Sequence, residues 1–422
     1  MSRSALVTGL GFITSIGNDR AAVTRSLREL RPGLAGIEFL GNPALPVRVA
    51  GTIKEFVVDS PSWRDWRYPE RYELPRETLR SLSSHGLYAL CAVEQALADA
   101  GLDRGALTDG ATGLYCASAG SAFMLHHHLA HMHAVRGERG NPMGVVASIA
   151  GTLNFNLAAH YGIRGAVGGF AAACASSSHA LGCALDDIRL GRQNRMLVVG
   201  AEEVNAETIL PFAAMRALST NPDPATASRP FDRKRDGFVG AGGAVCLILE
   251  EAETARRRGA PVYAELAGWG QAADGYNVAV SHPEGAGLAD AMRRALADAG
   301  LTPADIEYVN AHATSTPAGD RSEALALGTV FTAAGAHPRI SSTKGLTGHP
   351  LSMAGVMEAA FCALALRDGF TPGNANLTAP DEACAGLDLP VATLDAAPAT
   401  VLNNSSGFGG SNVCHVLRRA AG

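Results

Sequence analysis

The seven residues ALADAGL occur twice in the chain, at 96–102 and again at 295–301. Each copy ends an apolar-periodic run at a glycine, a residue favoured where a helix ends. Each is followed by a short turn region and a strand-like run ending in small and hydroxyl residues, GLYCASAGS at 113–121 and IEYVNAHATSTPAGD at 306–320. Seven matching letters alone can arise by chance among common helix formers. The same order of elements after both copies indicates one αβ unit built twice.

Strand-like and helical patterns alternate along the chain. Strand-like runs occupy 5–8, 113–117, 196–200, 245–249, 306–310 and 400–403. Helical patterns occupy 81–100, 178–190, 288–299 and 354–366. This alternation predicts an α/β protein with sheets sandwiched between helices.

A joint between two halves is predicted at 252–261, where AETARRRGAP reads as a charged helix end followed by Gly and Pro. We therefore expect an N-terminal half at 1–255 and a C-terminal half at 256–422. The first half contains an extra stretch around 118–165 that the second lacks. We expect this insertion to cover a site between the halves.

Composition narrows the class of protein. At 422 residues, 47% hydrophobic and 18% charged, the chain can bury ample core. The net charge of −5 argues against nucleic acid as a principal partner, and no apolar run is long enough to predict a membrane span. The opening MSRSALVTGLGF leads into a strand-like segment rather than a signal peptide, so we expect a cytoplasmic protein. The eight cysteines include no CxxC pair, so their spacing predicts neither a zinc site nor a disulfide framework.

One cysteine differs from the others. In AAACASSSHALGCALDDIRL, at 171–190, Cys174 stands where a run of small residues meets the start of a helix. We expect the three following serines to cap that helix and its dipole to favour the reactive thiolate. A cysteine between alanines is also readily explained by packing, so the functional interpretation requires partners.

The second half supplies candidate partners where its strands end. VNAHATSTPAGD, at 309–320, places His312 at a turn with Thr314 and Thr316 on the same side. STKGLTGHPLSMAGVMEA, at 342–359, offers Lys344 and His349 in a glycine-rich turn that leads into a helix. This position in the second unit corresponds to that of Cys174 in the first. The repeat therefore predicts a nucleophile on one copy and histidines on the other.

Five motifs in this order resemble the β-ketoacyl-acyl carrier protein synthases, condensing enzymes of the thiolase fold, with the closest likeness to the fatty-acid elongating I/II type. They are ACASS at 173–177, RPFDRKRDGFV at 229–239, NAHATSTPAGD at 310–320, KGLTGHPLSMAG at 344–355 and NNSSGFGGSN at 403–412. The resemblance implies duplicated αβ halves that form a layered α-β-α-β-α sandwich.

The resemblance also implies roles for particular residues. It gives Cys174, His312 and His349 as the catalytic triad and Lys344 with Glu358 as a supporting ion pair. The other implied residues are Asp320 and Glu323 behind His312, Thr314 and Thr316 on the pantetheine arm, Phe408 as a gate, and Arg76 and Arg80 for docking the carrier.

The implied reaction is transfer of an acyl group to Cys174, decarboxylation of a malonyl thioester and condensation to a 3-ketoacyl thioester, in chain elongation of fatty-acid or polyketide type, for example polyene. A thiolate is needed as nucleophile and later as leaving group. Two neutral imidazole N–H groups suit the enolate oxygen, and we expect acylation itself to depend on the helix end and backbone donors. The expected partners are an acyl carrier protein bearing acyl and malonyl thioesters and a second subunit. That subunit is a second copy paired through 165–173 or a related chain. We expect no metal and no redox cofactor.

The chain departs from the family pattern in three places. Gly242 stands where a glutamate is expected, and Ser406 replaces the first aromatic residue of the Phe-Gly-Phe loop. Pro350, Ser352 and Met353 stand where smaller or hydroxyl residues are usual, and a proline after His349 favours an extended backbone there. These departures point to a specialised substrate.

Two other functions compete with a ketosynthase. VTGLGFITSIG, at 7–17, is a weak dinucleotide-binding pattern that would suit a dehydrogenase. A non-catalytic partner subunit of the chain-length-factor kind would share the fold but lack the nucleophile, which Cys174 supplies here. His127 and His131 lie one helical turn apart, and we expect them on a helix of the insertion rather than at a metal.

Overall fold

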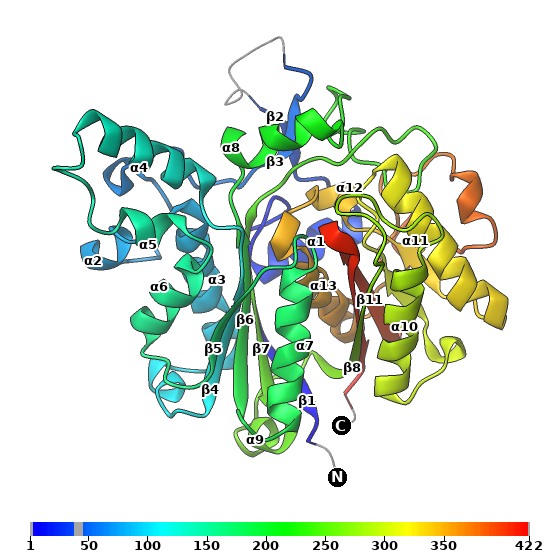
Figure 1. Cartoon of the computed structure of the whole chain (residues 1–422). Coiled ribbons are helices and arrows are strands. Elements are labelled where there is room, and N and C mark those ends of the chain that lie inside the picture. Colours follow the sequence, from blue (N-terminus) through cyan, green and yellow to red (C-terminus); the bar gives the residue numbers. More distant parts are fainter. Residues whose placement is uncertain (1–2, 38–44, 421–422) are drawn as a thin grey trace.

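The computed structural model describes residues 3–37 and 45–420, and its ten-stranded sheet shows the duplication directly (Figure 1). The first-half strands are β1 (Ala5–Ile13), β4 (Thr112–Ala117), β5 (Val167–Phe170), β6 (Arg195–Glu202) and β7 (Gly243–Glu251). The second-half strands are β8 (Ala264–Ala273), β9 (Tyr308–Asn310), β10 (Arg339–Ser341), β11 (Thr400–Gly407) and β12 (Ser411–Arg418). Counted outward from the middle, the order is β1-β7-β6-β4-β5 on one side and β8-β12-β11-β9-β10 on the other. Each strand thus has a counterpart at the same place in the other half.

The pairing directions repeat as well. In the first half β4 is parallel to β5 and β6, and β7 is antiparallel to β1 and β6. In the second half β9 is parallel to β10 and β11, and β12 is antiparallel to β8 and β11. The halves join where β1 and β8 pair through three residues of each strand. The predicted duplication of an αβ unit is confirmed.

The repeated heptapeptide forms the end of the same helix in each half. α3 (Ser84–Ala100) and α10 (Ala286–Ala299) both end at a left-handed glycine, Gly101 at φ 64° and Gly300 at φ 67°. In each case the glycine and the leucine after it donate backbone hydrogen bonds to the last helical turn. α3 packs on β1 and β7, and α10 packs on β8 and β12. The identical letters therefore specify identical helix ends on the two outer faces.

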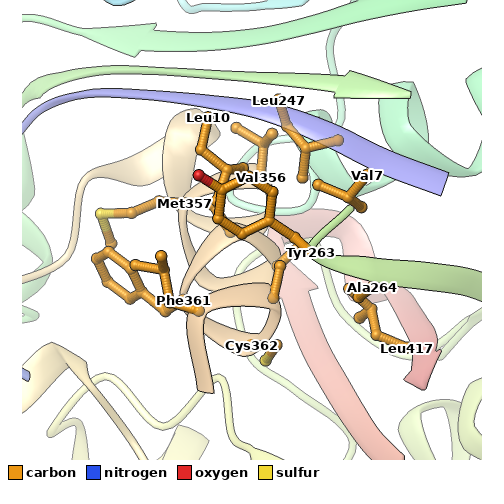
Figure 2. Close-up of a cluster of buried hydrophobic side chains, with 14 of the residues drawn as sticks. Val7, Leu10, Leu247, Tyr263, Ala264, Val356, Met357, Phe361, Cys362 and Leu417 are labelled. Carbon is orange, nitrogen blue, oxygen red and sulfur yellow. The ribbon is translucent and has the colours of Figure 1, made fainter. Parts of the chain in front are cut away.

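Two further helices lie between the sheets of the two halves (Figure 1). α7 (Ser176–Arg189) and α13 (Ala354–Asp368) contact each other and strands of both halves. Figure 2 shows side chains of α13 packed against strand residues of both halves. Those drawn from α13 include Val356, Met357, Phe361 and Cys362, and those from the strands include Val7, Leu10, Leu247, Ala264 and Leu417. The layers are α3, the strands of the first half, α7 with α13, the strands of the second half, and α10. This is the expected α-β-α-β-α sandwich.

The boundary between 255 and 256 stays a prediction, because the two halves share this central core. The predicted joint contains α9 (Ala252–Arg257), and β8 follows it. The remaining helices are α1 (Arg20–Glu29), α2 (Arg76–Leu79), α4 (Ala122–Ala134), α5 (Gly144–Ser148), α6 (Thr152–Tyr161), α8 (Ala206–Ile209), α11 (Pro317–Val330) and α12 (Lys344–Thr347), and a small separate sheet pairs β2 (Leu34–Gly36) with β3 (Val49–Gly51). The insertion forms α4 to α6, on the side of the molecule that carries β4 and β5 (Figure 1).

His127 and His131 are exposed on α4, as the spacing predicts. Over residues 3–37 and 45–420, no three His, Cys, Asp or Glu side chains are grouped so as to hold a metal ion. Over the same residues, no helix has both the length and the apolar character needed to cross a bilayer.

Candidate active site

A cavity of about 330 Å³ brings the predicted catalytic residues together. Its walls come from Cys174 and from segments within 212–217, 279–281, 312–319, 349–351 and 406–410. Among them are Cys174, His312, His349, Thr314, Thr316 and Phe408. No residue of 118–165, all of which the structure describes, lines this cavity. The expectation that the insertion covers the site is therefore wrong for a single chain.

Cys174 lies in a tight turn between β5 and α7. The residue before it, Ala173, has a left-handed backbone with φ 48°, which is unusual for a residue with a side chain. Ser176 holds the turn, because its Oγ accepts from the backbone N–H of Ala172 at 2.8 Å and donates to the carbonyl of Ala173 at 2.6 Å. Helix α7 has no side-chain N-cap, so the predicted capping by the serines is wrong. The serine side chains are instead used to fix the turn and to bond other elements.

The surroundings of Cys174 favour the neutral thiol over the thiolate. Burial raises its pKa to about 12, and the positive charge of Lys344 offsets only part of that effect. Loss of water thus opposes the stabilisation of the thiolate that was expected from the helix end, and α7 starts two residues after Cys174, at Ser176. The Sγ atom lies 3.0 Å from Nε2 of His349. Cys174 therefore has a hydrogen-bonding imidazole within reach of its proton.

His312 and His349 stand beside each other at the cavity. Their ring centroids are 5.3 Å apart and their planes are nearly perpendicular, at 89°. Burial lowers the pKa of both imidazoles well below the ordinary value, and the nearby positive charge of Lys344 lowers them further. Both rings are therefore neutral near pH 7, as the reaction expected from the sequence requires.

The backbone around each histidine is fixed by hydrogen bonds. Glu323 accepts from the N–H of His312 at 2.9 Å and from that of Ala313 at 2.6 Å. Asp320 accepts from the N–H of Thr314 at 2.9 Å, so both predicted carboxylates lie behind His312. His349 forms an extended bridge instead, donating to the carbonyl of Val239 at 2.7 Å and accepting from the N–H of Ala241 at 3.1 Å. This extended backbone agrees with the constraint expected from Pro350.

Lys344 and Glu358 form a fully buried, hydrogen-bonded ion pair. Burial raises the pKa of Glu358 to about 7 although Lys344 opposes the shift. The second oxygen of that carboxylate, Oε2, has no hydrogen-bond partner among the described residues. The pair brings a positive charge close enough to lower the pKa of both histidines.

Thr314 and Thr316 line the cavity with their hydroxyls 3.1 Å apart. Sequence reasoning missed the residue that holds this segment. The buried guanidinium of Arg235 donates to the backbone carbonyls of Thr316 at 3.1 Å and Pro317 at 2.7 Å. Its position inside RPFDRKRDGFV was the only available signal.

Phe408 forms part of the cavity wall and is 41% exposed. Its ring contacts Phe212 at a centroid distance of 6.1 Å, and Gly409 after it donates to the carbonyl of Val278 at 2.8 Å. Ser406 also lines the cavity, and its hydroxyl donates to Asn412 at 2.7 Å. The loop therefore presents one aromatic side chain to the site and one polar one.

Other wall residues were not predicted from the sequence. Met215 and Arg216 line the cavity and are exposed, so this edge of the site carries one apolar and one cationic side chain. Arg76 and Arg80 are exposed too, but they belong to α2 and its end and do not line the cavity. The structure does not bring this pair to the catalytic residues within one chain.

Gly242 is required by close packing. A Cβ atom there would lie 2.7 Å from the carbonyl oxygen of Glu202 and 2.9 Å from the nitrogen of Val204. The turn after β6 thus occupies the space that a side chain at 242 would need. The local backbone therefore accommodates the glycine expected to be a glutamate.

Known proteins share this fold and sequence. Residues 3–255 match the model of the beta-ketoacyl synthase N-terminal domain, and residues 263–378 match that of the beta-ketoacyl synthase C-terminal domain. The chain is 38% identical over 428 residues to 3-oxoacyl-[acyl-carrier-protein] synthase 1 of Haemophilus influenzae, with 100% of both chains covered. It is 33% identical to 3-oxoacyl-[acyl-carrier-protein] synthase 2 of Staphylococcus aureus, with 99% of each chain covered.

Solved structures agree with these relatives. A beta-ketoacyl synthase from Burkholderia phymatum superposes with a TM-score of 0.90 at 32% identity, with 100% of both chains covered. The ishigamide ketosynthase/chain length factor superposes with a TM-score of 0.89 at 29% identity, also with 100% of both chains covered. The full-length matches, the thiolase-like duplication and the cavity that gathers the five motifs lead to one conclusion. The chain belongs to the β-ketoacyl synthase family, and it is a condensing acyltransferase.

Proposed function

We propose that Cys174 is the acyl-accepting nucleophile of this synthase and that His312 and His349 serve the decarboxylation and condensation steps. The observation that carries the proposal is the contact of 3.0 Å between Sγ of Cys174 and Nε2 of His349, with the ring of His312 beside it. A thiol, two neutral imidazoles and a cavity that reaches all three suit thioester chemistry.

In the first half-reaction the sulfur of Cys174 attacks the carbonyl carbon of an acyl thioester. Because the pKa of the thiol is raised to about 12, its proton must leave as the new bond forms. His349 is the proposed base, because its Nε2 lies 3.0 Å from Sγ, and this role is added to those expected of the helix end and the backbone donors. The carrier thiolate leaves with a proton, and the backbone N–H groups of Cys174 and Phe408 are the proposed donors to the oxyanion. Gly407 allows those two segments to meet, since a Cβ there would lie 3.1 Å from the nitrogen of Cys174.

In the second half-reaction a malonyl thioester loses its carboxylate. The bond to the carboxyl carbon breaks, carbon dioxide leaves, and the electron pair moves into an enolate whose oxygen accepts hydrogen bonds from His312 and His349. Neutral imidazoles are suited to this task because they donate without adding a full charge. The enolate carbon then attacks the acyl group on Cys174, and the sulfur leaves and regains a proton. The product is a 3-ketoacyl thioester.

The substrates proposed for this chain are thioesters of an acyl carrier protein. The two relatives described above carry that carrier in their names, 3-oxoacyl-[acyl-carrier-protein] synthases. Thr314 and Thr316 supply the polar wall for the pantetheine arm. The exposed cations Arg76 and Arg80 are the proposed docking contacts for the acidic carrier. Substituting both by Ala should raise KM for the carrier-bound thioester and leave KM for a free pantetheine thioester unchanged.

A two-fold dimer through β5 is part of the proposal. Within the part of the chain that the structure describes, β5 lies at the end of the sheet and pairs with β4 alone, and Val167 on it is 42% exposed. An unpaired edge of this kind can be covered by the same strand of a second copy, which gives a closed two-fold contact. A related chain in the second position would pair in the same way.

The decisive experiment is intact-protein mass spectrometry after incubation with a panel of acyl-carrier thioesters. Cys174→Ala should take up no acyl group, whereas Cys183→Ala, a matched change at a half-exposed cysteine of α7, should acylate normally. Condensing activity of Cys174→Ala above about one per cent of wild type would overturn the assignment, since loss of a covalent nucleophile costs several orders of magnitude. Absence of acylation in the wild type would favour the non-catalytic partner subunit instead.

A further inference from the structure

The turn that follows His349 packs against the end of β6. After His349 and Pro350 comes a 3-10 turn, Leu351–Met353, which leads directly into α13. Within that turn Ser352 and Met353 are buried. Their contacts with β6 tie the turn after His349 to that strand.

Met353 fits against a glycine of β6. A Cβ atom at Gly200 would lie 3.0 Å from Cα of Met353 and 2.8 Å from a methyl group of Val356. Gly200 thus allows the turn to approach the strand closely. The turn after His349 and the end of β6 therefore form one packed unit.

Ser352 bonds to the last residue of that strand. Its hydroxyl donates to Oε1 of Glu202, and the same oxygen accepts from the backbone N–H of Ala119 at 3.1 Å. Glu202 is 1% exposed and Ser352 is 5% exposed, so water does not compete for these bonds. Gly242 packs against the backbone carbonyl of Glu202, so the backbone at the end of β6 is closely packed as well. A buried carboxylate held in this way is a rigid acceptor for the serine.

We propose that Glu202 is a positioning residue of the active site, which holds His349 at Cys174 by bonding Ser352. Its carboxylate accepts from Ser352 and from the backbone of Ala119, so the proposed effect on His349 passes through the turn at Leu351–Met353. The proposal rests on the proposed function only in that His349 takes part in catalysis.

The titration of Glu202 allows the proposal to be tested by the pH dependence of the condensation rate as well. Burial raises the pKa of Glu202 to about 7, with His85 opposing the shift and Glu203 adding to it. Cys174, the other titratable group that interacts with it, stays a neutral thiol near pH 7 because of its own raised pKa. Glu202 thus gains its negative charge across the pH range of an assay. Ionisation strengthens its acceptance of the Ser352 hydrogen bond, so the condensation rate should rise with pH around 7 for this reason.

The test combines Ser352→Ala, Glu202→Ala, Glu202→Gln and the double variant Ser352→Ala with Glu202→Ala. Ser26→Ala is the control, since it removes a hydrogen bond to the carbonyl of Ile16, and neither residue lines the cavity. Acyl-enzyme formation, carbon dioxide release from a malonyl thioester and condensation are followed for each across pH 6 to 8.5. Circular dichroism and the thermal midpoint report whether each variant is folded.

Ser352→Ala and Glu202→Ala should each lower the rate constant of condensation by about tenfold at pH 8 with little change in KM. This is less than the roughly hundredfold cost of a full 1 Å displacement. The double variant should lose no more than either single variant, because both changes break one contact. Glu202→Gln should retain most activity, since an amide oxygen can accept both bonds, and should lose the rise in rate around pH 7.

Wild-type rates in Ser352→Ala, or losses that multiply in the double variant, would overturn the positioning role. His349→Ala separates this failure from failure of the proposed function. If His349→Ala were as active as wild type, the role of His349 would be wrong. If it were inactive while Ser352→Ala was unaffected, only the link through Glu202 would be wrong. A Glu202→Ala variant that failed to fold would leave Ser352→Ala and Glu202→Gln to decide.

Discussion

Replacing Lys344 by Met should make the stability of this protein fall with rising pH. Lys344 and Glu358 have fully buried side chains, and they are joined by a hydrogen bond. Methionine fills similar space without the charge, so the variant leaves the Glu358 carboxylate buried beside Glu323, which repels it. Breaking a buried pair in this way typically costs about 3–5 kcal/mol when the remaining group is ionised.

The pH dependence follows from the pKa of Glu358. In the wild type burial raises that pKa from an ordinary 4.5 to about 7. The stability that is lost when the Glu358 carboxyl ionises has therefore been lost in full above pH 7. Loss of Lys344 removes the main influence that lowers it, and the pKa rises further. A folded-state pKa above the unfolded one means that the native state binds the extra proton, so stability is lost as pH rises towards the folded pKa. Between pH 7 and 9 the variant should lose up to about 1.4 kcal/mol per pH unit more than the wild type.

Urea denaturation of wild type and Lys344→Met at pH 7, 8 and 9 measures this slope. Glu358→Gln introduced into Lys344→Met should remove it, because no buried carboxylate remains. Arg293→Met makes the same change of charge in an exposed pair with Asp290 and should show no extra slope. If the wild-type and Lys344→Met midpoints moved in parallel from pH 7 to 9, the buried carboxylate would not be the source of the cost. Lys344→Met should still form acyl-enzyme while releasing carbon dioxide more slowly.

Four further outcomes follow from the site and the sheet edge. Replacing His312 by Ala should slow decarboxylation by about 2.7–4 kcal/mol, the range for losing one oxyanion donor, and leave acylation nearly normal; slow acylation with normal carbon dioxide release would contradict this. His349→Ala should impair both steps, because this ring also contacts the nucleophile at 3.0 Å, and parallel mass and carbon dioxide assays would show it. Sedimentation at micromolar concentration should give a dimer paired through the segment 165–173, and an active monomer would refute that contact. Gly407→Ala should reduce acylation, since a Cβ there would lie 2.6 Å from the carbonyl of Ala172; an unchanged acylation rate in the mass assay would rule out this steric argument.

Local signals in the sequence determined the duplicated architecture. Two identical heptapeptides ending in glycine specify two identical helix ends, because the left-handed C-cap is a local demand of the backbone. The alternation of apolar runs specified the order of strands and helices in the same way. Cys174, His312 and His349 were also singled out from the sequence, since each follows a strand-like run at a turn rich in small residues, and the structure places all three at one cavity.

Tertiary structure decided what those residues become. The sequence indicated a thiolate at Cys174, but burial raises the pKa of its thiol to about 12, and burial depends on elements brought together from the whole chain. The serines after it were expected as caps, yet Ser177 and Ser178 bond to residues far along the chain, which no local pattern reveals. Contacts over long separations settle such questions, because hydrogen-bond partners and loss of water are properties of the packed molecule. Glu202 bonds to Ser352, which lies 150 residues further along the chain, and no spacing in the sequence predicts that contact.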